Sequence, residues 1–457
     1  MTVTDLAADL AAALRPALGT GVTVDGLVRE PGGASRETWS FWARLTDGSA
    51  RRLILRRDPV DTPGSGLRLE GSLLRAAHRA GVPVPLIVAA GDDTAALGPG
   101  ALVLEFVDGE TIPRRILRDP ALAEIRPRLA ARCGEVLAAI HRIPRAEVPG
   151  LPGGDPLEQM RATVDRLGQP HPAFELAFRW LGDHRPPRAV PVVVHGDFRN
   201  GNLIVGPDGI RAVLDWELAH SGDPVEDLAW LCVKAWRFGA EAPVGGFGSV
   251  DELVAAYEGA GGTAVDRAAL RWWEVLGTLR WGVICLVQTV THLSGLYRSV
   301  ELAAIGRRVC EVEWDLLDLL GLLETAPGPG PGDTSGATGP DATGAVPTLH
   351  DVPSAAELLD AVEEFLRTDV ADATSGRVRF HSRVAANVVA LVRRQLTAGA
   401  KPEADHRAQL ARLGVADDAE LADAIRAGRL DERGDEVAGA VAAAVAAKLF
   451  VAHPGYR

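Results

Sequence analysis

The stretch HGDFRNGNLIVGPDGIRAVLDWE, from His195 to Glu217, decides the fold of this chain. The apolar run 192–194 just before it predicts a short buried strand that ends at the histidine. Two further strand-like runs, 203–205 and 210–214, are separated by the turn sequence GPDG and predict a hairpin. The second run delivers Asp215 to the end of that hairpin.

Three polar residues have fixed places in this stretch. Asp197 lies two residues after His195, Asn202 lies five residues after Asp197, and Asp215 ends the hairpin. Asn and Asp supply the hard oxygen ligands that Mg²⁺ prefers, and this order is the layout of a kinase active site. Asp, Asn and Gly also cluster in ordinary loops because they suit turns. Turn chemistry explains neither the Asp-to-Asn spacing nor the Asp that ends the next strand, so we predict a phosphotransferase site.

Composition limits the other classes of function. The 457 residues suffice for two or three domains, and 47% of them are hydrophobic, as in soluble globular proteins. No segment is apolar for long enough to cross a membrane, and the N-terminal apolar run, which contains Asp5 and Asp9, predicts a helix and not a secretion signal. The four cysteines are scattered without metal-ligand spacing, which favours a reducing cytoplasm. The net charge of −13 disfavours nucleic acid as a partner.

The chain divides into segments of different character. Residues 20–107 are rich in strand-like runs, and residues 110–324 are mostly helical in pattern. The stretch 325–347 contains mainly Pro, Gly, Ser and Thr, which predicts a flexible linker. Ser354 and Glu357 form a capping box that opens a final helical segment without a catalytic or metal motif. We predict an α+β chain with domain boundaries at 1–107, 108–324, 325–348 (linker) and 349–457.

The sequence HGDFRNGNLIV…VLDWELAHSGDPVEDLAWL resembles the aminoglycoside phosphotransferase family, distant relatives of the protein kinases. Within that family, the motif residues most resemble the branch of kinase domains associated with acyl-CoA dehydrogenases. The resemblance covers roughly the first 320 residues. It implies a bilobal protein-kinase-like fold with a small β-rich N-lobe and a larger helical C-lobe, followed by a separate all-α domain. That last domain resembles a helical domain of unknown function attached to such phosphotransferases.

The resemblance also implies a cofactor and a role for each residue of the central stretch. The cofactor would be ATP with Mg²⁺, and the acceptor an alcohol group of a small molecule. Asp197 would orient the hydroxyl or accept its proton, while Asn202 and Asp215 would coordinate the metal.

The phosphates of the nucleotide need a cation in the small lobe. In kinases it ends the third strand and pairs with a helix glutamate, and these positions fall on Arg56 and Glu70. The family more often has lysine at the first position; arginine keeps the charge, but its planar fork differs from an ammonium group. The alternative is that both residues are exposed charges on a polar face.

Two further parts of the small lobe are candidates for nucleotide contacts. Gly33 and Ser35 lie in a glycine-containing turn whose backbone could approach phosphates, although a plain hairpin turn has the same composition. Glu105 and Val107 fall where the resemblance places the hinge, whose main chain would hydrogen-bond adenine.

Three functions remain open at this point. The resemblance favours a kinase that phosphorylates a hydroxyacyl-CoA or a related acyl metabolite. The first alternative is an aminoglycoside or macrolide phosphotransferase. The second is a non-catalytic nucleotide-binding regulator, for which the arginine at position 56 is the main support. The C-terminal helical domain is expected to dock a partner or to dimerise, and no contact with nucleic acid or membrane is expected.

Overall fold

The computed structural model of the chain describes residues 3–30, 37–58, 67–97, 100–323 and 354–456. These residues form two compact units, which are considered separately below. The first unit combines Met1–Gly154 with Pro186–Gly277, and the second combines Asp155–Arg185 with Thr278–Arg457.

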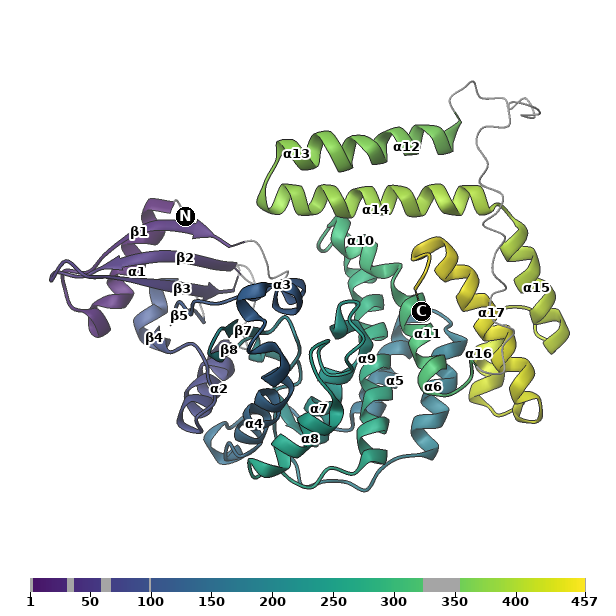
Figure 1. Cartoon of the computed structure of the whole chain (residues 1–457), viewed down its shortest axis with the longest axis horizontal. Coiled ribbons are helices and arrows are strands. Elements are labelled where there is room, and N and C mark those ends of the chain that lie inside the picture. The colour runs from purple at the N-terminus through teal and green to yellow at the C-terminus, as the bar shows by residue number, and fades with distance from the viewer. Residues whose placement is uncertain (1–2, 31–36, 59–66, 98–99, 324–353, 457) are drawn as a thin grey trace. The chain divides into compact units, whose positions relative to one another are not determined.

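The first unit begins with a small antiparallel sheet in the strand order β1-β2-β3-β5-β4 (Figure 1). Helix α1 (Val3–Leu18) packs against it, and α2 (Leu67–Arg79) follows the third strand. The strands are β1 (Thr23–Arg29), β2 (Glu37–Arg44), β3 (Ala50–Arg57), β4 (Ile87–Ala90) and β5 (Leu102–Glu105).

The core of this lobe follows from the spacing of its apolar residues. Leu53 and Leu55 are two apart on β3, so both point to the same face of the sheet, where both are fully buried. Leu6, Leu10 and Leu14 are four apart on α1 and form the buried face of that helix. These two faces belong to one apolar cluster, which fixes the sheet against α1.

The rest of the first unit is helical, with two short pairs of strands inserted. Strands β7 and β8 form the predicted antiparallel hairpin, and β6 pairs with β9. Helix α4 packs along α8. The elements are α3 (Pro113–Arg118), α4 (Leu129–His141), β6 (Val192–Val194), β7 (Leu203–Gly206), β8 (Gly209–Val213), β9 (His220–Gly222), α7 (Val225–Cys232) and α8 (Val250–Gly259). This β-rich small lobe joined to a helical lobe confirms the predicted α+β class.

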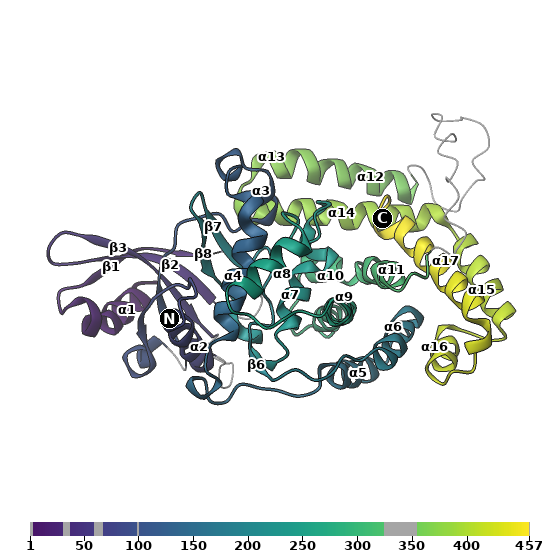
Figure 2. The same ribbon diagram turned by 60° about the horizontal axis from the view of Figure 1, so that its bottom comes forward.

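The second unit consists of helices. Helix α9 (Arg267–Leu293) starts in the first unit and continues into the second. Helix α16 lies beside α6 (Figure 2), and α11 packs against α17. The other helices are α5 (Pro156–Leu167), α6 (Pro172–Asp183), α10 (Val300–Gly306), α11 (Val309–Leu319), α12 (Ala355–Phe365), α13 (Ala371–Ala373), α14 (Gly376–Ala398), α15 (Lys401–Leu413), α16 (Asp418–Arg426) and α17 (Gly434–Ala452).

One apolar core joins helices from both sides of the predicted linker. Leu421 of α16 and Val441 of α17 share it with Ala173 of α6 and Leu317 of α11. The last helices are thus supported by helices that precede residue 324. The linker predicted at 325–348 lies wholly outside the described residues. The predicted domain boundaries therefore stay a prediction.

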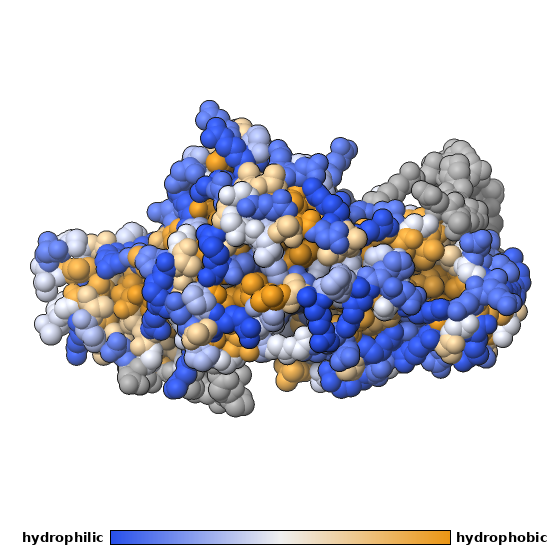
Figure 3. Space-filling model, turned by 90° about the horizontal axis from the view of Figure 1, so that it is seen from below, coloured by the Kyte–Doolittle hydropathy of each residue, from blue (hydrophilic) through white to orange (hydrophobic). Residues whose placement is uncertain are grey.

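No described helix combines the length and apolarity needed to cross a bilayer. On the face shown in Figure 3, hydrophilic residues surround smaller apolar areas.

Candidate active site

The catalytic-loop stretch starts where β6 ends. Val194 of β6 is opposite His220 of β9, so the chain enters the loop from a paired strand. Gly196 then adopts φ +77°, and a Cβ on it would lie 2.4 Å from the carbonyl oxygen of Leu218. Only glycine fits this place, which explains the middle residue of His-Gly-Asp.

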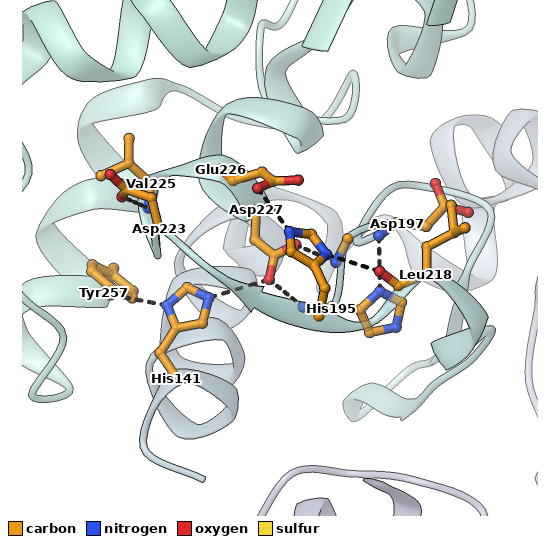
Figure 4. A network of polar contacts seen from close by, with 11 residues as sticks. His141, His195, Asp197, Leu218, Asp223, Val225, Glu226, Asp227 and Tyr257 are labelled. Carbon is orange, nitrogen blue, oxygen red and sulfur yellow. Dashed lines mark hydrogen bonds and ion pairs between the residues drawn. The ribbon is translucent and has the colours of Figure 1, made fainter. Parts of the chain in front are cut away.

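A buried carboxylate beneath the loop holds its backbone (Figure 4). Asp227 of α7 accepts hydrogen bonds from the backbone N–H groups of His195 (2.8 Å) and Gly196 (2.9 Å). It also contacts Nε2 of His141 at 3.2 Å, and Nδ1 of that ring lies 2.9 Å from the hydroxyl of Tyr257. Burial opposes the charge of Asp227, but the hydrogen bonds and nearby histidines lower its pKa overall.

His195 supports the loop from the other side and is neutral. Burial lowers the pKa of its imidazole, against the opposing effect of nearby carboxylates. Its Nδ1 accepts a hydrogen bond from the N–H of Asp197 at 3.2 Å, so the proton lies on Nε2, 3.0 Å from the carbonyl oxygen of Leu214. The imidazole of His195 thereby holds Leu214, the residue before Asp215, at a fixed position relative to Asp197.

The Asp197 carboxylate is held by three side-chain donors. Its Oδ1 accepts from Nε of Arg199 (3.0 Å) and Nε1 of Trp230 (2.8 Å). Its Oδ2 accepts from Nδ2 of Asn202 at 2.6 Å. The guanidinium of Arg199 also lies 4.5 Å above the ring of Trp236. The carboxylate therefore has one orientation, as a group that positions a hydroxyl must.

Asn202 and Asp215 are brought together by the hairpin. The carbonyl oxygen of Asn202 accepts from the N–H of Leu214 at 2.8 Å, which ties it to the residue next to Asp215. The side-chain nitrogen of Asn202 donates to the carbonyl and carboxylate oxygens of Asp197, so the side-chain oxygen of Asn202 points away from Asp197. Asp215 adopts φ +60°, a left-handed conformation that is uncommon outside glycine, and its side chain is 48% exposed.

These two residues fit a magnesium site completed by phosphates. Two hard oxygen groups are what Mg²⁺ takes from a protein when the nucleotide supplies further ligands. Within the described part of the chain, no cluster of three or more His, Cys, Asp or Glu side chains could hold a metal alone.

The predicted pair in the small lobe is formed and extends to the catalytic hairpin. Arg56 Nη1 donates to Glu70, which is buried on α2. Arg56 Nη2 donates to Oδ1 of Asp215 at 3.0 Å. The alternative of two exposed charges is wrong, since the Arg56 side chain is 14% exposed and that of Glu70 1%. One guanidinium therefore bridges two carboxylates, one from each side of this site.

The other predicted nucleotide contacts are less defined. Gly33 and Ser35 lie outside the described residues. Glu105 ends β5, forms an ion pair with Arg51 and donates its N–H to the carbonyl of Leu86 at 2.8 Å. Val107 lies in the segment that leaves the sheet.

The segment that joins the two lobes is attached to the catalytic hairpin. Glu110 and Val205 exchange two backbone hydrogen bonds, of 2.8 and 3.0 Å. Gly109 allows this approach, since a Cβ on it would lie 2.9 Å from the carbonyl oxygen of Val205. The hairpin between Asn202 and Asp215 is thereby fixed to the chain that enters from the small lobe.

Sequence reasoning missed two of the groups that contact Asp197. Trp230 lies 33 residues away on α7, and Arg199 lies two residues away in the loop itself. A signal for Trp230 existed: it follows Asp227 by three residues and so lies on the same face of α7, toward the loop. Nothing in the spacing pointed to Arg199.

The comparisons with known proteins agree with this site. The model of the phosphotransferase enzyme family (APH) matches residues 31–273, more than half of the chain. The chain belongs to the phosphotransferase enzyme family. A second model, a domain of unknown function (DUF6285), matches residues 372–456, which confirms the predicted resemblance of the C-terminal helices.

The chain spans about a fifth of the length of two acyl-CoA dehydrogenase family members that it matches. Acyl-CoA dehydrogenase family member 10 of Mus musculus is 30% identical over 211 residues, 42% of this chain and 19% of that protein. Acyl-CoA dehydrogenase family member 11 of Gallus gallus is 33% identical over 173 residues, 34% of this chain and 21% of that protein. A candidate aminoglycoside phosphotransferase from Ralstonia eutropha has a similar fold, with a TM-score of 0.55 and 22% identity over 68% of this chain and 98% of its own. The predicted kinase-like fold and family are confirmed.

Proposed function

We propose that this protein transfers the γ-phosphoryl group of ATP to a hydroxyl of a small molecule. The observation that carries the proposal is the Asp197 carboxylate, held at both oxygens by three donors. It lies in the same loop-and-hairpin unit as Asn202 and Asp215, and Arg56 bridges Asp215 to Glu70. A non-catalytic nucleotide-binding protein has no physical need for a carboxylate fixed in this way.

Each residue has one task in this mechanism. Asp197 orients the acceptor hydroxyl and accepts its proton as the hydroxyl oxygen bonds to the γ-phosphorus, while the bond from that phosphorus to the β-phosphate oxygen breaks and ADP leaves. Arg199, Trp230 and Asn202 keep that carboxylate in place. Arg56 contacts the phosphates while Glu70 holds its guanidinium. Mg²⁺, held by Asn202 and Asp215, would neutralise the phosphate charge.

For the acceptor we propose a hydroxyacyl-CoA or a related acyl metabolite. The relatives named as acyl-CoA dehydrogenase family members support this choice. The surroundings of the loop do so too: a Cβ on Gly201 would lie 3.3 Å from Cγ of Pro113, which starts α3. That helix carries the exposed Arg114 and also Arg115, which lies 3.5 Å from the carboxylate of Glu110. Cations beside the catalytic loop favour a phosphate-bearing acceptor and disfavour a polycationic antibiotic.

The experiment is Mg²⁺-dependent ADP release with a mixed panel of acceptors. Hydroxyacyl-CoA esters would be tested beside aminoglycosides and macrolides, with Asp197→Asn in parallel. We expect release with the CoA esters and a loss of about 10²–10⁴-fold in kcat in the variant, with ATP affinity kept. Asp215→Asn should instead weaken binding of the metal nucleotide. Full turnover by Asp197→Asn would contradict its assigned role.

A matched pair of variants separates the acceptor class from the reaction. Arg114→Glu should raise the KM for a CoA ester and leave the KM for ATP unchanged. Arg118→Glu, at the other end of α3, is the control. If Arg114→Glu instead increased turnover of an aminoglycoside, the acceptor would belong to the antibiotic class. ATP binding without turnover of any acceptor would favour the regulator.

A further inference from the structure

Helices α12 and α14 form an antiparallel hairpin that carries an exposed apolar face. In α12, Leu358, Val362 and Phe365 are 54%, 47% and 55% exposed, and no residue of this helix is buried. In α14, Val378, Val392 and Leu396 are 57%, 38% and 54% exposed. We call these six residues the hairpin face.

Besides its exposed apolar residues, helix α14 has a second row of apolar residues at helical spacing, which faces the inside of the hairpin. Within the hairpin, α14 uses Ala386 and Ala390, which are buried. The exposed residues Val378 and Val392 are two heptads apart, and Leu396 is one turn further on. Such a repeat with two seams per helix is typical of a bundle of more than two helices.

The two exposed seams lie on the same side of the hairpin. Nε of Arg394 donates to the carbonyl of Val451 in α17, and a helix turns by about 100° per residue, so Val392 and Leu396 lie about 160° around α14 from that contact. Helix α10 borders the seam on one flank: Gln395, about 60° from Val392, accepts a hydrogen bond from Arg307, and His381 lies 3.8 Å from Glu301. The same geometry on the antiparallel α12 turns Leu358 and Phe365 to the same side as Val392.

The charges of the two helices are opposite. The segment 355–373 has six acidic residues and one arginine, whereas α14 has five arginines and no acidic residue. Inside the hairpin, Arg393 pairs with Asp360 and Glu363. For the arginines at the start of α14, the described part of the chain offers no side-chain partner; these are Arg377, Arg379 and Arg383.

We propose that the hairpin face binds the hairpin face of a second copy of this chain. Two hairpins then form a four-helix bundle in which each α12 lies beside the α14 of its own chain and that of the other chain. Acidic and basic helices alternate around such a bundle, and the six apolar residues of each copy fill its centre. The arrangement with like helices side by side would place acidic residues together and is disfavoured.

The test is the mass of the full-length protein in solution. The parent should have twice the mass of the single chain by sedimentation or light scattering. Replacing Leu358, Val362 and Phe365 together by Ser should weaken the dimer more than about a hundredfold, because each dimer loses these anchors twice. Val190→Ser, which removes an apolar side chain 83% exposed in the first unit, is the control and should remain dimeric.

A charge-reversal pair distinguishes the bundle from nonspecific association. Arg377, Arg379 and Arg383 replaced by Glu in one variant, and Glu364 and Asp372 replaced by Arg in another, should each give monomers. Mixing the two variants should restore a heterodimer. Circular dichroism checks that both keep the parent's helix content. A monomeric parent, a dimer that survives the Ser substitutions, or a mixture that stays monomeric would each overturn the proposal.

Discussion

The two units bury carboxylates for different purposes. Asp227 in the first unit and Glu313 in the second are both buried, and both have a lowered pKa. The oxygens of Asp227 contact two backbone N–H groups and a histidine of its own unit. Glu313 pairs instead with Lys448 at 3.2 Å and with His171 at 2.9 Å, each more than 130 residues away.

The first carboxylate positions a loop, and the second holds helices together. A carboxylate bound to backbone amides fixes the path of a loop, and here that loop carries Asp197. A carboxylate bound to distant cations joins helices that no local signal connects, and here those are α11, α17 and the start of α6. Damage to the first should appear in catalysis, and damage to the second in stability.

Among the variants that test this comparison, Asp227→Asn has the largest expected effect. Asparagine keeps one acceptor oxygen but points an N–H₂ group at a backbone N–H, so one buried donor loses its partner, at a cost of about 1–3 kcal/mol. We expect kcat to fall about a hundredfold, with ATP affinity nearly unchanged. Steady-state kinetics and a thermal melt of the same preparation would check it. If the variant lost stability but kept its full kcat, Asp227 would act like Glu313, and its assigned role in positioning the loop would be wrong.

Glu313→Gln should have the complementary result. It removes the charge that Lys448 and His171 both contact, and we expect the free energy of unfolding to fall by about 1–3 kcal/mol. The kcat of the folded enzyme should stay within about twofold of the parent, since the group does not contact the loop. Lys448→Met, which leaves His171 to Glu313, is the milder control. Loss of kcat at unchanged stability would contradict the division of tasks.

Trp230→Phe sharpens the first side of the comparison. It removes the donor at 2.8 Å from Oδ1 of Asp197 and keeps an aromatic ring beside Trp236. A hydrogen bond to a charged group contributes about 1.5–3 kcal/mol, so we expect kcat to fall about tenfold with the KM for ATP unchanged. Trp272→Phe, on a helix not in contact with Asp197, should have no such effect. Equal kinetics for both variants would remove Trp230 from the positioning set.

The smallest expected effect is a dependence of stability on pH in the second unit. Burial opposes the charge of Glu175, but Arg161 and Arg426 lower its pKa overall, below the ordinary 4.5. A carboxyl with a depressed folded pKa contributes stability that is present above its unfolded pKa and is lost as pH falls through the folded value. The melting temperature of the parent should therefore decline below about pH 4.5, and Glu175→Gln should flatten that decline. An unchanged slope would show that other carboxyls govern the acid limb.

Sequence predicted the parts of the site whose residues are close along the chain. The hairpin between residues 203 and 213, and the loop from His195 to Asn202, follow from local pattern and turn chemistry. Arg56 and Glu70 were also predicted, because the resemblance to kinases implies a cation at the end of the third strand and a glutamate on the next helix.

What sequence could not supply are contacts between distant segments. The bonds of Glu175 to Arg426, 251 residues away, depend on how α6 and α16 pack, and no local pattern encodes that. The same is true of Glu313 with Lys448. The exposed seam of α12 could be read as amphipathic from sequence, but which of its faces is free depends on where α14 and α10 pack.

The two hydrogen bonds between Glu110 and Val205 also help to hold the small sheet in place. They join the chain at Glu110 to the hairpin that ends at Asp215. β5 ends at Glu105, so Phe106 to Gly109 is a short link between the small sheet and this hairpin, and the hydrogen bond from the N–H of Val213 to the carbonyl of Pro83 is a second one. Because these two links lie at different points of the hairpin, they hold the small sheet against it and keep Arg56 opposite Asp215.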